Sequence, residues 1–172
     1  MQWAFTDSIS STFNRVTIAP KNLVDDVIGF LNVQLIKKKL IIKNLIDSEV
    51  RVDADKHMLM SIVRNLISNA IKYCNRDGEI TIALQSKNNE TQISISDTGV
   101  GIASETLKNL FDPSKIISKK GTEQEKGSGL GLQICKALVD RHDGEIWFDS
   151  EIGIGTTCYF TLSKNEIDQR KE

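Results

Sequence analysis

The chain has 172 residues, of which 40% are hydrophobic and 26% charged, and its formal net charge is −1. One globular domain fits this length, and a nearly neutral chain gives no electrostatic support for nucleic-acid binding. Three scattered cysteines without a CxxC pair argue against a zinc or disulfide framework. Because no apolar run approaches the ~20 residues of a membrane span and no signal peptide is recognisable, we expect a cytoplasmic domain, whose parent protein could still be membrane-anchored.

The first half of the chain alternates between helical and strand patterns. In order, it predicts a helical stub at 1–12, an edge strand at 13–18, a helix at 23–39, β-rich segments at 40–46 and 50–52 that could pair, and a helix at about 55–73. Asn22 stands where a cap would precede the first long helix, and Asp53 or Asp55 can cap the second.

The second half holds shorter elements joined by hairpin-length links. In order, it predicts strands at 80–85 and 93–96, a short helix at 104–111, a polar lid at 112–126, a helix at 130–141, and strands at 145–148 and 157–162. Helices gathered separately from hairpin-linked strands favour an α+β fold, a two-layer α/β sandwich with a mixed sheet. We assign residues 13–164 to this domain and 165–172 to a frayed tail.

The helix that reaches Tyr73 carries a polar stripe. Asn65, Asn69 and Lys72 fall within a narrow arc, beside apolar residues that would face the sheet. Asn is a poor residue for a helix interior because its amide competes for backbone hydrogen bonds. The stripe is therefore either a solvated face or a site where amide oxygens bind Mg²⁺ and Lys72 adds positive charge beside phosphates.

The segment DTGVGI follows the second predicted strand of the second half. Asp97 has the strand parity of Ile93 and Ile95, so it would point inward, where a carboxylate needs a donor such as an adenine amine. Gly99 and Gly101 would allow a close approach to the backbone. In the alternative interpretation, Asp97 only caps its own turn through an Asx bond.

The segment GSGLGL opens directly into a predicted helix. Backbone N–H groups at Gly127, Gly129 and Gly131, together with the helix dipole, would form an anion site. The GxGxG spacing and the polar sequence before it do not fit a Rossmann motif, and no GKS or GKT follows, as a P-loop requires. The later segment GIGTT, residues 153–157, is by itself a hairpin turn.

Two lysine runs have less specific interpretations. Residues 37–39 are interpreted as the solvated end of a helix, since a charge run usually faces water. Lys119 and Lys120 fall in the expected lid, where a role at phosphate is open.

The order and spacing of these motifs are more specific than any one of them. NLISNAIKY, DTGVGI, LFDP, GSGLGL and GIGTT resemble the N, G1, F, G2 and G3 boxes of sensor histidine kinases. The resemblance covers about residues 20–163. It implies the Bergerat (GHKL) ATPase fold, shared with type II topoisomerases, mismatch-repair ATPases and heat-shock chaperones, with a flexible ATP lid and with ATP and Mg²⁺ as cofactors.

The resemblance also implies roles for individual residues. Asn69 would ligate Mg²⁺, whereas Asn65 and Lys72 would act at the phosphates as the catalytic residues. Tyr73 would lie against the adenine, and Asp97 would accept a hydrogen bond from its amine. The other residues expected around the nucleotide are Gly99, Gly101, Ile102, Phe111, Lys126, Gly127, Ser128, Gly129, Leu130, Gly131, Leu132 and Thr157.

The chain departs from the kinase pattern in two places. Ser114 follows Pro113 where a second aromatic residue often stands, which weakens the expected anchoring of the lid on that side. Neither His57 nor His142 has the context of a phosphoacceptor, and both have helix-end positions that favour structural roles. The chain thus resembles a catalytic fragment, with residues 1–12 as the remnant of the histidine-bearing helical hairpin.

The leading hypothesis is a protein-histidine kinase fragment of a two-component system. It would bind MgATP and donate the γ-phosphate to a histidine on a dimerisation hairpin, in the parent chain or in trans, and would reach a response regulator only indirectly. The alternatives are an ATP-dependent binding module without kinase activity and a serine kinase of the anti-sigma-factor type. Because the hairpin is the usual dimer element, we expect a monomeric fragment, and we expect no nucleic-acid partner.

Overall fold

The computed structural model describes residues 12–87, 90–112, 114–115, 120–125 and 129–163. Its elements, in chain order, are β1 (Arg15–Ile18), α2 (Pro20–Lys38), β2 (Ile41–Asn44), β3 (Val52–Asp55), α3 (Lys56–Tyr73), β4 (Glu79–Lys87), β5 (Glu90–Asp97), α4 (Ser104–Leu107), α5 (Gly131–Asp140), β6 (Ile146–Glu151) and β7 (Gly155–Ser163). The predicted stub, except residue 12, and the predicted tail lie outside the described residues. Within the described part of the chain, no helix has the length and apolar character needed to cross a membrane.

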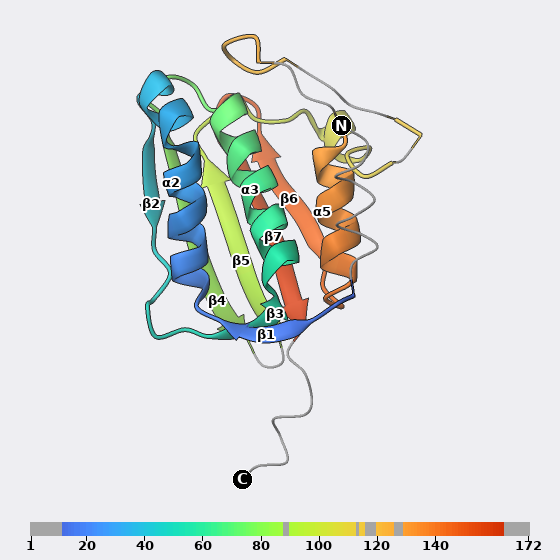
Figure 1. Ribbon diagram of the computed structural model, residues 1–172. Helices are drawn as coiled ribbons and strands as arrows, with labels where there is room; N and C mark the ends of the chain where they lie inside the picture. The colour runs from blue at the N-terminus through green and yellow to red at the C-terminus, as the bar shows by residue number, and fades with distance from the viewer. Residues whose placement is uncertain (1–11, 88–89, 113, 116–119, 126–128, 164–172) are drawn as a thin grey trace.

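The larger sheet has five strands in the order β2-β4-β5-β7-β6. Only β2 and β4 pair in parallel, whereas β4–β5, β5–β7 and β6–β7 pair antiparallel. Helices α2, α3 and α5 lie side by side over one face of this sheet, with α3 in the middle (Figure 1). The mixed sheet and its single layer of long helices confirm the predicted two-layer α+β sandwich.

The predicted pairing between residues 40–46 and 50–52 is wrong. β2 joins β4, with Ile42 opposite Ile80, and β3 pairs antiparallel with β1 in a separate two-stranded sheet, with Val52 opposite Ile18. Segments that are close in sequence pair only when a tight turn folds one onto the other. Here the turn that begins at Asp47 instead carries the chain from one sheet to the other.

Helix α2 begins earlier than predicted. Its first residue is Pro20 and its N-cap is Ala19, which makes no side-chain cap, so the assignment of Asn22 as the cap is wrong. Proline suits a first helical position because its fixed φ is already helical and its missing N–H has no partner there. Pro20 therefore starts this helix, and Asn22 lies inside it.

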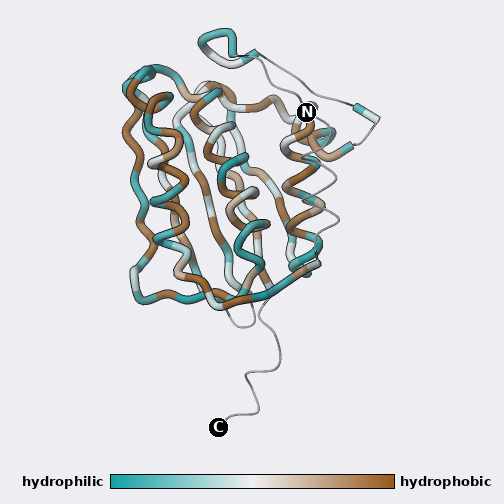
Figure 2. The backbone as a smooth tube through the Cα atoms, viewed as in Figure 1, coloured by the Kyte–Doolittle hydropathy of each residue, from teal (hydrophilic) through white to brown (hydrophobic). Residues whose placement is uncertain are grey.

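Helix α3 supplies the centre of the core. Figure 2 shows hydrophobic and hydrophilic stretches alternating along the helices, as expected for elements with one face against a sheet. The buried residues of α3 are Met58, Leu59, Ile62, Val63, Leu66, Ile67, Ala70 and Ile71. They share a core cluster with the inward residues of the central strands, among them Ile80, Ile82, Ile93 and Ile95. The opposite arc of α3 is left for polar residues.

The N-terminus of α3 is capped by Asp55, one of the two caps predicted. This carboxylate is 6% exposed and accepts hydrogen bonds from the backbone N–H groups of His57 and Met58, each at 3.0 Å. It also accepts one from Asn14 N at 3.0 Å. Burial opposes ionisation, but the three N–H donors outweigh it and hold the pKa of Asp55 below its usual value.

His142 lies against this cap as a fully buried ring, 0% exposed. Its Nε2 accepts the backbone N–H of Asp55 at 3.1 Å, and its Nδ1 lies 2.8 Å from the carbonyl oxygen of Leu138. Nδ1 must then carry the proton, which fixes a neutral tautomer. Burial lowers the pKa of His142. The residue is structural, as expected, but as a neutral imidazole and not as a cation at a helix end.

We predict that Asp55→Ala lowers the free energy of unfolding by about 2 kcal/mol, the upper end for a helix cap, because the variant leaves three N–H groups without their acceptor. Urea denaturation of the purified chain measures this. Asp53→Ala is the matched control, since Asp53 is an exposed residue of the same strand whose carboxylate accepts a hydrogen bond from Thr17 Oγ1 and caps no helix. Equal losses in the two variants would contradict the cap assignment.

Candidate functional site

A cavity of about 510 Å³ lies beside the C-terminal half of α3. Its other walls come from the DTGVGI loop after β5, the start of α5 and the β6–β7 hairpin. The sequence-predicted residues that line it are Asn65, Asn69, Lys72, Tyr73, Asp97, Gly101, Ile102, Gly129, Gly131 and Leu132. The fold therefore brings together residues from motifs that are far apart in the sequence.

Other predicted residues do not line the cavity. These are Gly99, Phe111, Leu130 and Thr157. Thr156 and Cys158 line it instead of Thr157, which alternates to the other face of β7 and lies 2.9 Å from Ser96 through the hydroxyl oxygens. Lys126, Gly127 and Ser128 fall outside the described residues.

Asp97 ends β5 at one side of the cavity. Its Oδ1 accepts the backbone N–H of Gly99 at 2.8 Å, which is the Asx turn that the sequence offered as an alternative. The carboxylate nevertheless lines the cavity, and burial raises its pKa to about 6 even though N–H groups of Gly99 and Thr156 lower it. An ionised carboxylate has about four acceptor sites, so these two bonds leave capacity for a donor in the cavity.

The glycines of DTGVGI make room for protein backbone. A Cβ at Gly99 would collide with the carbonyl oxygen of Tyr73, and one at Gly101, where φ is +71°, would collide with that of Glu151. Between them, Val100 N donates to Tyr73 O at 3.2 Å, and Val100 O accepts from Gly153 N at 3.0 Å. The loop is thus wedged between the end of α3 and the β6–β7 hairpin, which fixes Asp97 beside Tyr73.

The start of α5 approaches the other end of the polar stripe. Asn65 Nδ2 donates to Ser61 O at 3.0 Å, and Asn65 Oδ1 lies 3.4 Å from the place a Cβ on Gly131 would take. Gly129 adopts φ +74°, and the N-cap Leu130 makes no side-chain cap. The first N–H groups of a helix of this kind favour an anion. Asn65 and Tyr73 are about 12 Å apart along α3 at 1.5 Å per residue.

Two lysines add positive charge to the cavity wall. Lys72 Nζ lies 4.7 Å from the centre of the Tyr73 ring, and both residues line the cavity. Lys120, whose role the sequence left open, also lines it. The cavity therefore combines a carboxylate near the Tyr73 end, a helix N-terminus near the Asn65 end and two lysines in its wall. This polarity suits a ligand that has a hydrogen-bonding base joined to anionic groups.

Apolar residues that the sequence did not single out complete the walls. Phe148 and Ile152 of the β6–β7 hairpin line the cavity. Phe111 packs behind Phe148, with ring centres 5.8 Å apart, so it supports the wall without facing the cavity. Strand parity could have identified Thr156 and Cys158, but only once the phase of β7 was known.

The described side chains alone would not complete the coordination shell of a divalent cation here, so a bound phosphate ligand would have to supply oxygens. Among the described residues, no group of three or more His, Cys, Asp or Glu could hold a metal ion. Mg²⁺ commonly keeps several waters and shares the rest of its shell between one or two protein oxygens and phosphates. Asn69 lines the cavity, and an amide oxygen suits such a shared site.

Over residues 54–166 the sequence matches the family of histidine kinase-, DNA gyrase B- and HSP90-like ATPases. The chain belongs to this family. It is 33% identical over 168 residues to the sensor histidine kinase WalK of Bacillus subtilis (strain 168), covering 96% of this chain and 28% of WalK. It is 41% identical over 115 residues to the histidine protein kinase DivJ of Caulobacter vibrioides, covering 66% of this chain and 19% of DivJ. The chain thus spans less than a third of these relatives.

Solved structures confirm the fold. The catalytic domain of the histidine kinase ThkA, in a nucleotide-free form, superposes with a TM-score of 0.75 at 25% identity, covering 88% of this chain and 98% of that domain. The Acinetobacter baumannii histidine kinase AdeS gives a TM-score of 0.76 at 23% identity, covering 95% of this chain and 74% of that one. The predicted ATPase fold is therefore confirmed, as is the resemblance of this chain to the catalytic domains of histidine kinases.

We predict a pH-dependent effect of Asp97→Asn on stability. Because the folded-state pKa is raised from 3.8 to about 6, the native chain binds more protons than the unfolded chain between these values. The stability contributed by Asp97 is therefore full below pH 3.8 and is lost as the pH rises through 6.

The variant has no such titration, so relative to wild type it should gain roughly 2–3 kcal/mol in unfolding free energy between pH 4 and pH 8. Urea denaturation of both chains at the two pH values measures the difference. A difference that does not change with pH would show that the folded-state pKa of Asp97 is not raised.

Proposed function

We propose that this domain binds MgATP in the cavity and donates the γ-phosphate to a histidine on a dimerisation hairpin, as part of a two-component sensor histidine kinase. The observation that carries the proposal is the polarity of the cavity: the half-buried carboxylate of Asp97 at one side and the α5 N-terminus beside Asn65 at the other. Membership of the ATPase family and the names of the relatives support it.

Each end of the cavity has a part in holding the nucleotide. The Asp97 carboxylate accepts a hydrogen bond from the adenine amine, and Tyr73 lies against the ring. The phosphates lie toward Asn65, Lys72 and the first N–H groups of α5, where positive charge and backbone donors meet. Asn69 would hold Mg²⁺, which would supply positive charge to neutralise the phosphates.

Phosphoryl transfer needs little covalent chemistry from the protein. Its catalysis is mainly positioning and electrostatic stabilisation of the transferred group. Asn65 and Lys72, which line the cavity, would serve these tasks. His57 lies in the first turn of α3, about 12 Å along the helix from Asn65 and outside the cavity lining, and His142 is buried with both ring nitrogens in hydrogen bonds. The acceptor is then a histidine elsewhere. A response regulator is the downstream partner, a proposal supported by the structure of the histidine kinase ThkA in complex with the response regulator TrrA.

Calorimetric titration tests the nucleotide site. Wild type should bind MgATP, and Asp97→Asn should weaken binding roughly 10- to 100-fold, because an amide in place of the carboxylate presents donors as well as an acceptor to the adenine amine. Asp149→Asn is the control, since Asp149 is an exposed acid on β6 outside the cavity lining. Equal affinities of wild type and Asp97→Asn would rule out the adenine assignment.

Radiolabelled ATP tests the transfer. The chain alone should acquire no label, and it should label a separately added histidine-bearing hairpin in an acid-labile form. Stable, acid-labile labelling of the chain itself would overturn the assignment of the acceptor to another segment. An acid-stable product would point to a serine kinase, and binding without any transfer to the hairpin would point to a nucleotide-dependent binding module.

A further inference from the structure

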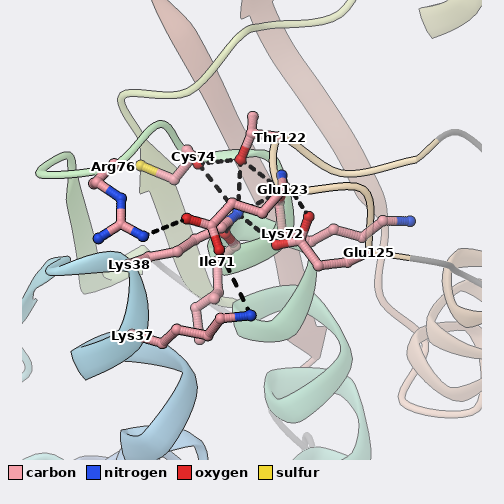
Figure 3. A network of polar contacts seen from close by, with 9 residues as sticks. All are labelled: Lys37, Lys38, Ile71, Lys72, Cys74, Arg76, Thr122, Glu123 and Glu125. Atoms are coloured by element: carbon pink, nitrogen blue, oxygen red, sulfur yellow. Dashed lines mark hydrogen bonds and ion pairs between the residues drawn. The ribbon is translucent and has the colours of Figure 1, made fainter.

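A buried lysine lies at the C-terminal end of α3. Lys38, the last residue of α2, is 2% exposed, so the interpretation of residues 37–39 as a solvated helix end is wrong for this residue. Its Nζ donates to the carbonyl oxygens of Ile71 and Lys72 at 2.8 and 2.9 Å and lies 3.4 Å from that of Cys74 (Figure 3). A cation there satisfies carbonyls that the helix cannot pair itself and complements the negative end of the dipole.

The same ammonium also holds a distant segment. Lys38 Nζ donates to Thr122 Oγ1 at 2.7 Å and forms an ion pair with Glu125 Oε1 at 2.6 Å. Thr122 in turn donates from N to Lys72 O at 3.1 Å and from Oγ1 to Cys74 O at 2.9 Å. One buried charge therefore joins the ends of α2 and α3 to residues within the segment predicted as a lid.

Residues Gly121–Glu125, here called the docked turn, have a closed set of contacts. Gln124 N donates to Gly121 O and Gly121 N to Glu125 O, both at 3.0 Å, and Glu123 N donates to Glu125 Oε2 at 2.8 Å. On its outer side, Glu123 pairs with Arg76 at 2.8 Å and with Lys37 at 3.7 Å. Backbone hydrogen bonds within the turn thus define its conformation, and ion pairs to Lys38 on one side and to Arg76 and Lys37 on the other hold it in place.

The docked turn also packs closely against Lys72. A Cβ on Gly121 would lie 2.6 Å from Lys72 Cγ and 2.7 Å from Lys72 O, so only glycine allows this approach. The preceding residue, Lys120, lines the cavity, as Lys72 does. The position of the turn therefore bears on both lysines at once. Burial opposes the charge of Glu125, but the hydrogen bond and charge of Lys38, together with backbone N–H groups of Glu123 and Glu125, outweigh burial and keep the pKa of Glu125 below its ordinary value.

We propose that Lys38 is a positioning residue for the phosphate end of the site: through Glu125 and Thr122 it fixes the docked turn on the end of α3 and so sets Lys72 and Lys120 beside the cavity. This inference rests on the proposed function, since it assumes that phosphates lie near Lys72. Lys38 touches no ligand in this scheme. It acts on the nucleotide only through the docked turn.

The test separates the phosphates from the base. MgATP and adenosine are competed in turn against a fluorescent ATP analogue, with wild type, Lys38→Met and Glu125→Gln. Glu125→Gln keeps the shape of the side chain and leaves Lys38 bonded to the α3 carbonyls, so it decides the matter if Lys38→Met fails to fold. The matched control is Glu79→Gln, which breaks the 2.6 Å ion pair with Lys43, a pair 37% and 49% exposed on the edge of the sheet.

We expect Glu125→Gln and Lys38→Met to weaken MgATP binding roughly tenfold and adenosine binding by less than about twofold, and Glu79→Gln to change neither, because an exposed pair contributes little. Hydrogen exchange of the amides at 121–125 should rise in both turn variants. Equal losses for MgATP and adenosine, an unchanged MgATP affinity, or unchanged exchange would each overturn the positioning role. A wild-type chain that binds neither ligand would overturn the proposed function itself, and this inference with it.

Discussion

Helix α3 is held at both ends by buried charges of opposite sign. At the first turn, the Asp55 carboxylate accepts hydrogen bonds from backbone N–H groups, and at the last turn the Lys38 ammonium donates hydrogen bonds to backbone carbonyls. Each charge also complements the helix dipole at its own end. Because the apolar arc between these ends is packed on the sheet, the helix can neither slide nor rotate without breaking one of these contacts. The polar stripe of α3 therefore has a fixed place.

That fixed place sets the geometry of the cavity. The DTGVGI loop hydrogen-bonds to Tyr73 near one end of the stripe, and the start of α5 lies against Asn65 near the other. Gly99 and Gly101 let the DTGVGI loop approach backbone closely at its end, and Gly131 lies in ordinary contact with the Asn65 side chain at the other. The helix itself therefore sets the spacing of the two ends. A ligand that reaches both ends must be about as long as the stretch of α3 from Asn65 to Tyr73, so the helix sets the length of the ligand.

Sequence periodicity and cap chemistry predicted the parts of the fold that depend on local residues. The Asp55 cap, the inward parity of Asp97 and the polar stripe at Asn65 follow from short-range patterns. The partners of β2 and β3 did not, because strands of four residues carry little periodic information and their pairing is decided by the rest of the sheet. Thr157 was assigned one position away from the cavity residue Thr156, since a turn sets the phase of the strand that follows it.

The burial of Lys38 had no local signal. A lysine within a charge run is normally solvated, but this one is buried between the end of α3 and the docked turn, whose Thr122 is 84 residues further along the chain. The glycine at 121 gave no signal either, since its close approach to Lys72 is a tertiary contact. Site features of this kind follow from where distant segments meet.

The two edges of the five-stranded sheet carry a further consequence. β2 has only four residues and exposes the charged Lys43, and β6 exposes Asp149 and Glu151. Short edges with charged side chains oppose the addition of strands from another molecule. The two edge strands thus oppose edge-to-edge aggregation of the chain as its concentration rises.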